Sequence, residues 1–97
     1  MNKLEKARLA INEVDAQIAQ LFEKRMLAVK DVVAYKMENG LPVFDGAREK
    51  EVISKNLAKI TDETLKPYYE DMLIQLMRIS KEYQKSIMES KGKNTEK

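Results

Sequence analysis

The sequence predicts an all-α protein with three helices per chain and a very long first helix, assembled as an intertwined helical homodimer. Residues 2–38 contain neither glycine nor proline, so one uninterrupted helix can run through them. Apolar residues recur along that stretch at the spacing of a packed helix, and the chain has no β-strand pattern of alternating polarity. The two prolines and three glycines divide the remainder into two further helices.

The first helix fits a heptad repeat when Leu4 is taken as position a. Nine of the ten a and d positions are uncharged and mostly apolar, and the exception is Arg25. The a positions are Leu4, Ile11, Ile18, Arg25 and Val32, and the d positions are Ala7, Val14, Leu21, Ala28 and Tyr35.

The length of this helix predicts the dimer. A helix over residues 2–38 is roughly 55 Å long, whereas a compact domain of this size has a radius of gyration of about 12–13 Å. Two shorter helices do not cover its whole apolar stripe. We therefore expect a second copy of the chain to pack along it, in an obligate homodimer.

The first helix should end at Asn39 and Gly40, because Asn-Gly favours left-handed backbone and Pro42 forces the residue before it to be extended. Asp45 is placed to cap a second helix over about residues 46–59.

The connector at residues 61–64 leads to Pro67, a residue suited to the first turn of a third helix that ends near residue 89. We expect a single domain over residues 1–90 and a polar, disordered tail over residues 91–97.

Composition excludes several functions of the 97-residue chain. It has no cysteine and no histidine, which excludes disulfides, thiolate nucleophiles, Cys/His zinc sites and Ser-His-Asp triads. The net charge of +2 lies entirely in residues 91–97, and a neutral body is not typical of nucleic-acid binding. The chain shows no membrane span and no signal peptide, so we expect a cytoplasmic protein.

Two cations interrupt the apolar side of the first helix. Arg25 and Lys36 are eleven residues apart, which places them on one face, three turns from each other. One interpretation is that Arg25 fixes the register of the helical seam by pairing with an acid of the partner chain. The other is a shared anion-binding role.

The two other predicted helices carry further candidates. Asp45, Arg48 and Glu49 share one face of a first helical turn, which is either a solvated cap with an ion pair or part of a site. Ser80 and Gln84, four residues apart, interrupt an otherwise apolar face, either at a boundary with water or in an internal pocket. Only four of the 18 basic residues are arginines, Arg8 among them, and arginine suits bidentate binding of carboxylates.

This ordered set resembles the all-helical (type II) chorismate mutases over about residues 3–88. The resemblance rests on Arg8, the segment Val14 to Leu21, Arg25, Lys36, the Asp45-x-x-Arg48-Glu49 turn, Ser80 and Gln84. It implies three helices per chain, an intertwined dimer, and the rearrangement of chorismate to prephenate in phenylalanine and tyrosine biosynthesis. It also implies that no cofactor, metal or covalent intermediate takes part.

The resemblance assigns the roles of the site residues. Arg25 and an Arg8 donated by the partner chain would clamp the substrate carboxylates, while Lys36 and Gln84 would donate to the ether oxygen. Glu49 would accept from the ring hydroxyl. The supporting roles fall to three residues: the Asp45 backbone assists Glu49, Arg48 adds positive charge and orients Glu49, and Ser80 touches a carboxylate.

Two other functions remain open from the sequence. One is isochorismate-pyruvate lyase, an enzyme that resembles this family in fold. The other is a non-catalytic helical regulatory or dimerisation module, and docking to another shikimate-pathway enzyme is a related expectation.

Overall fold

The computed structural model describes the backbone of residues 1–95 and the side chains of residues 1–91. These residues form α1 (Lys3–Glu38), α2 (Gly46–Leu57), a short 3-10 helix η1 (Glu63–Leu65) and α3 (Lys66–Thr95). The predicted all-α class with three helices is confirmed.

Both ends of α1 are fixed by local hydrogen bonds. The Asn2 side chain accepts from the backbone N–H of Glu5 at 2.8 Å and caps the first turn. At the other end Gly40 has φ +62°, and the N–H of Leu41 donates to the Lys36 carbonyl at 2.8 Å. Glycine adopts this left-handed conformation without strain, and α1 ends at Glu38 as predicted.

α2 begins at Gly46, directly after its predicted cap Asp45. The Asp45 carboxylate accepts from the backbone N–H of Arg48 at 3.1 Å. α2 ends at Leu57, two residues before the predicted end. The 3-10 helix η1 follows, and the Asp62 side chain caps it by accepting from the backbone N–H of Thr64. Pro67 occupies the first turn of α3 as predicted.

The end of α3 differs from our prediction. We expected the helix to end near residue 89, yet it continues through Thr95, so most of the predicted tail at 91–97 is helical. No proline follows Pro67 and Gly92 is the single glycine of this stretch, so no strong signal ends the helix earlier. Glu96 and Lys97 lie outside the described residues.

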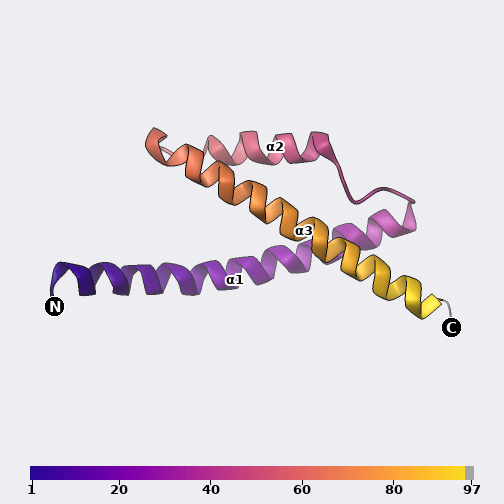
Figure 1. Cartoon of the computed structure of the whole chain (residues 1–97), viewed down its shortest axis with the longest axis horizontal. Coiled ribbons are helices and arrows are strands. Elements are labelled where there is room, and N and C mark those ends of the chain that lie inside the picture. The colour runs from indigo at the N-terminus through magenta and orange to yellow at the C-terminus, as the bar shows by residue number, and fades with distance from the viewer. Residues whose placement is uncertain (96–97) are drawn as a thin grey trace.

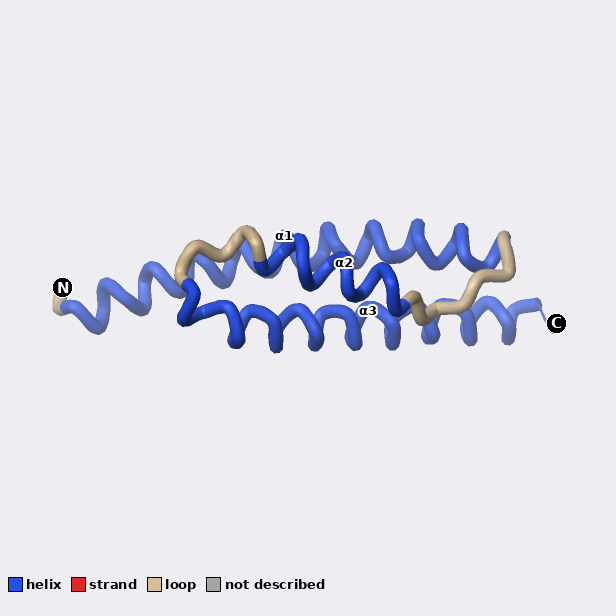
Figure 2. Tube along the Cα trace, turned by 90° about the horizontal axis from the view of Figure 1, so that it is seen from above, coloured by secondary structure: helices blue, strands red, loops and turns tan. Residues whose placement is uncertain are grey.

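α3 is the helix that packs against both of the others. Figure 1 shows α3 running from beside α2 to cross the C-terminal half of α1, and Figure 2 shows the same arrangement from above. Val29 and Val33 of α1 are buried together with Leu73 and Met77 of α3. These four side chains are the buried apolar core of the described residues.

The N-terminal end of α1 extends beyond the rest of the chain (Figure 1). The radius of gyration is 17.4 Å, against about 12–13 Å for a compact domain of this length. Residues 1–24 are all exposed, and Ile11, Ile18 and Leu21 of the predicted stripe are 56%, 54% and 63% exposed. The two valines that α1 buries lie beside that stripe rather than in it, so a single chain leaves the stripe uncovered.

Among the described residues, no helix combines the length and the apolar character that crossing a membrane requires.

Candidate active site

A cleft of about 250 Å³ lies between α1, α2, α3 and the segment that joins α1 to α2. This volume is at the small end of ligand pockets. Seven of the eight site residues predicted from the sequence line it: Arg25, Lys36, Asp45, Arg48, Glu49, Ser80 and Gln84.

The floor of the cleft holds the only two polar side chains that are buried among the described residues. Ser80 is 7% exposed and Gln84 is 6% exposed. No buried side-chain nitrogen or oxygen in the described part of the chain lacks a hydrogen-bond partner. Both residues face the cleft, so of the two interpretations the structure supports the internal pocket.

Lys36 and Gln84 form a hydrogen-bonded pair. The Lys36 ammonium donates to the Val43 carbonyl at 2.8 Å and to Gln84 Oε1 at 3.3 Å. An ammonium carries three N–H donors, so one remains for a ligand. Because Gln84 presents its oxygen to Lys36, its own amide nitrogen is a second donor at the same place.

Arg25 is held by Ser80. The half-buried Arg25 guanidinium donates through Nη1 to the Ser80 hydroxyl, and that hydroxyl donates to the Leu76 carbonyl at 2.8 Å. A serine hydroxyl has a single proton, and here it goes to the helix backbone. Ser80 therefore orients Arg25.

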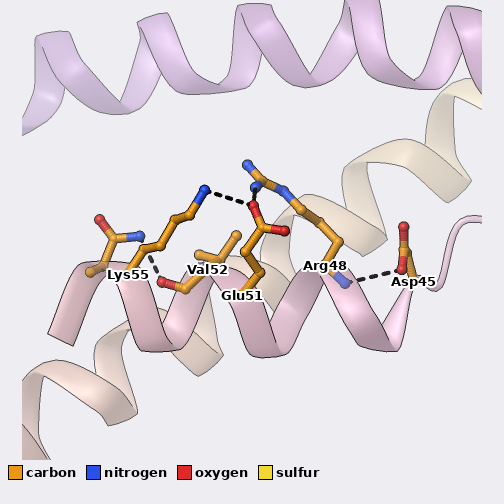
Figure 3. A network of polar contacts seen from close by, with 6 residues as sticks. Asp45, Arg48, Glu51, Val52 and Lys55 are labelled. Atoms are coloured by element: carbon orange, nitrogen blue, oxygen red, sulfur yellow. Dashed lines mark hydrogen bonds and ion pairs between the residues drawn. The ribbon is translucent and has the colours of Figure 1, made fainter. Parts of the chain in front are cut away.

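Arg48 forms its ion pair with Glu51 and not with Glu49, the acid that we expected it to orient. It donates instead to Glu51 at 2.8 Å, and Glu51 also accepts from Lys55 at 3.0 Å (Figure 3). The Lys55 hydrogen bond and charge, followed by the charge of Arg48, hold the pKa of the Glu51 carboxyl below its usual range. The reason is local, because Glu51 lies three residues after Arg48 and its side chain projects from the same side of α2.

Glu49 is paired with Lys81, a residue that the sequence did not single out. Glu49 Oε2 lies 2.9 Å from Lys81 Nζ, and the same ammonium lies 5.1 Å from the centre of the Phe44 ring. Lys81 lines the cleft as well. Its position directly after Ser80 and three residues before Gln84 was the available signal, since both neighbours were already candidates.

Arg8 is the one predicted site residue that a single chain does not bring to the cleft. It lies in the uncovered N-terminal part of α1 and is exposed to solvent. Its expected role depends on a second chain.

The comparisons with known proteins give one family. A family model described as chorismate mutase type II matches residues 7–85, which include Arg8 and the whole cleft. No curated protein and no solved structure matches the chain. The family match covers most of the chain and agrees with its all-helical fold. The chain belongs to the chorismate mutase type II family.

Proposed function

We propose that this protein is a chorismate mutase, which rearranges chorismate to prephenate in the biosynthesis of phenylalanine and tyrosine. The observation that carries the proposal is the Lys36–Gln84 pair, a charged donor and an amide side by side in a cleft. The residues lining the cleft include two more cations than carboxylates, which suits a substrate with two negative charges. Membership of the family supports the same reaction.

The reaction is an intramolecular Claisen rearrangement and moves no proton. Chorismate is a flexible dianion that must fold into a chair-like conformer with its two reacting carbons in contact. Holding both carboxylates preorganises that conformer. Arg25 has the fork geometry to hold one of them, and Arg8 of a second chain would contribute to the clamp.

The barrier is lowered at the ether oxygen. Negative charge develops there as the C–O bond breaks, and fixed donors bind that charge better in the transition state than in the ground state. The third Lys36 proton and the Gln84 amide nitrogen are these donors. Lys36 is the stronger because it is charged.

The rim of the cleft completes the contacts. Glu49 accepts from the ring hydroxyl, with the Asp45 backbone assisting, and Arg48 adds positive charge at the entrance. Ser80 orients Arg25 until its hydroxyl turns from Leu76 to a substrate carboxylate.

The active form in this proposal is a homodimer. The uncovered apolar stripe of α1 supports it, because an exposed surface of this length is stabilised by a second copy of the same helix. In that arrangement the N-terminal part of α1 reaches the cleft of the partner and delivers Arg8.

A mixed-dimer experiment tests the shared site. Arg8→Ala and Arg25→Ala chains are each expected to be nearly inactive alone. Co-refolded in equal amounts, they should recover roughly a quarter of the wild-type activity, because half of the dimers are mixed and each mixed dimer has one intact site. The control pairs Arg8→Ala with the double variant Arg8→Ala/Arg25→Ala, which regenerates no intact site. Recovery no greater than in the control would exclude a contribution from Arg8 across chains.

The reaction itself is tested by incubating the purified protein with chorismate and identifying the products by NMR. We expect prephenate to form faster than in buffer. Release of pyruvate from isochorismate would identify the lyase instead. A folded helical dimer that converts neither compound would favour the regulatory module, and docking to another pathway enzyme would become the leading function.

A further inference from the structure

Lys81 joins three parts of the cleft wall. It projects from α3, its ammonium lies 2.9 Å from Glu49 Oε2 on α2, and it lies over the Phe44 ring in the segment between α1 and α2. The side chains of Lys81 and Glu49 are 30% and 26% exposed. An ion pair that is partly shielded from water is screened less than a surface pair, and it restricts both side chains.

The Lys81 ammonium contacts two protein groups at the wall of the cleft. The ammonium forms an ion pair with Glu49, and the Phe44 ring lies within the distance at which aromatic rings attract cations. These two contacts hold the ammonium at the wall of the cleft, beside Glu49. The geometry therefore connects Lys81 to a ligand through Glu49.

Glu49 needs such a partner if it is to serve a dianion. A lone carboxylate in the cleft would repel both carboxylates of the substrate, and a freely rotating one would seldom meet the ring hydroxyl. Lys81 offsets the charge of Glu49 and restrains its carboxylate at Oε2, which leaves Oε1 as the oxygen for a ligand. Arg48, the neighbour expected to do this from the sequence, is occupied with Glu51.

We propose that Lys81 is a positioning residue that holds Glu49 ready to accept the hydroxyl of the substrate. This inference rests on the proposed function of the cleft. Because the hydroxyl contact exists in the ground state as well as in the transition state, its loss acts on substrate binding more than on turnover.

The first test is a set of three variants. Lys81→Met keeps the length of the side chain and removes its charge. We expect it to raise KM for chorismate by about ten-fold, as is typical for the loss of a residue that orients a ligand-binding group, with kcat changed less than about three-fold. Lys81→Arg should restore most of the loss, because it again pairs with a carboxylate.

The matched control is Lys66→Met. Lys66 pairs with Glu63 at 2.9 Å and is 31% exposed, so the lysine itself matches Lys81 in ion-pair length and exposure on the same helix, while its acid is 80% exposed and the pair lies outside the cleft. It should leave KM unchanged, because it removes a lysine charge from α3 without touching the cleft. If Lys81→Met, Lys66→Met and the wild type have equal KM values, the proposal is overturned.

A double-mutant cycle separates positioning from direct contact. Adding Lys81→Met to Glu49→Gln should raise KM less than two-fold beyond Glu49→Gln alone, because the residue through which Lys81 acts is already lost. Fully additive effects would mean that Lys81 touches the substrate itself and would overturn the positioning role.

The wild type shows which proposal has failed. An active wild type whose KM is insensitive to Lys81→Met overturns the Lys81 proposal alone. A wild type that binds chorismate without converting it overturns the mutase, and the Lys81 variants are then compared by their Kd for chorismate, with the same ten-fold change expected. A wild type that neither binds nor converts chorismate overturns both.

Discussion

Lys36→Ala is expected to lower kcat for chorismate by about a hundred- to a thousand-fold, the usual consequence of removing a preorganised donor to a developing oxyanion. The Lys36 ammonium reaches Gln84 at 3.3 Å and the Val43 carbonyl at 2.8 Å, so the protein fixes its position before any ligand arrives. Because Lys36 binds the ether oxygen more strongly in the transition state than in the ground state, KM should change much less than kcat.

The fold should tolerate this change. The cleft is open to solvent, so water replaces the lysine at both acceptors and limits the cost of leaving them unpaired. Lys50→Ala, at an exposed position of α2 that does not line the cleft, is the control. Near-full activity in Lys36→Ala, measured beside an unchanged melting temperature, would show that electrostatic stabilisation at this position is not the source of the rate.

Arg25→Leu should abolish measurable turnover while the melting temperature is kept or raised. The substitution removes a half-buried cation from beside Ala28, Val29 and Val32, where leucine packs favourably. It leaves no buried polar group unsatisfied, because the Ser80 hydroxyl keeps its bond to the Leu76 carbonyl at 2.8 Å.

This pair of measurements decides between the two interpretations of Arg25. Activity is followed with chorismate and stability by thermal unfolding, and Arg25→Lys is the companion variant, which keeps the charge but loses the fork. A large fall in melting temperature would favour a role in fixing the register of the dimer. Activity lost at unchanged stability is the result expected of a substrate-binding residue.

Much of the fold could be predicted because its signals are local. The end of α1 follows from Asn39 and Gly40, and the start of α2 from Asp45, since each acts within one turn of its own position. The end of α3 was missed because no comparable signal exists there. A helix without a strong stop continues for as long as its backbone hydrogen bonds form.

The sequence predicted which residues line the cleft, but not which of their side chains form ion pairs with one another. Helical spacing brought Arg48 and Glu49 to one turn of α2, yet Arg48 contacts Glu51 and Glu49 contacts Lys81. Which acid an arginine meets depends on side-chain rotamers and on the approach of another helix. Neither is encoded in the spacing of residues within one helix.

The connection between α2 and α3 contributes nothing to the cleft. Residues 58–65 line none of it, whereas Ser80, Lys81 and Gln84 enter it from one helix, α3, which packs against both α1 and α2. The cleft therefore tolerates insertions and deletions in this connection as long as α3 keeps its packing against α1 and α2. Across a family built this way, the spacing within α3 is expected to be inherited strictly while the distance from α2 drifts. A sequence alignment that is anchored on Ser80 and Gln84, and that allows gaps between α2 and α3, would match the equivalent site residues among family members.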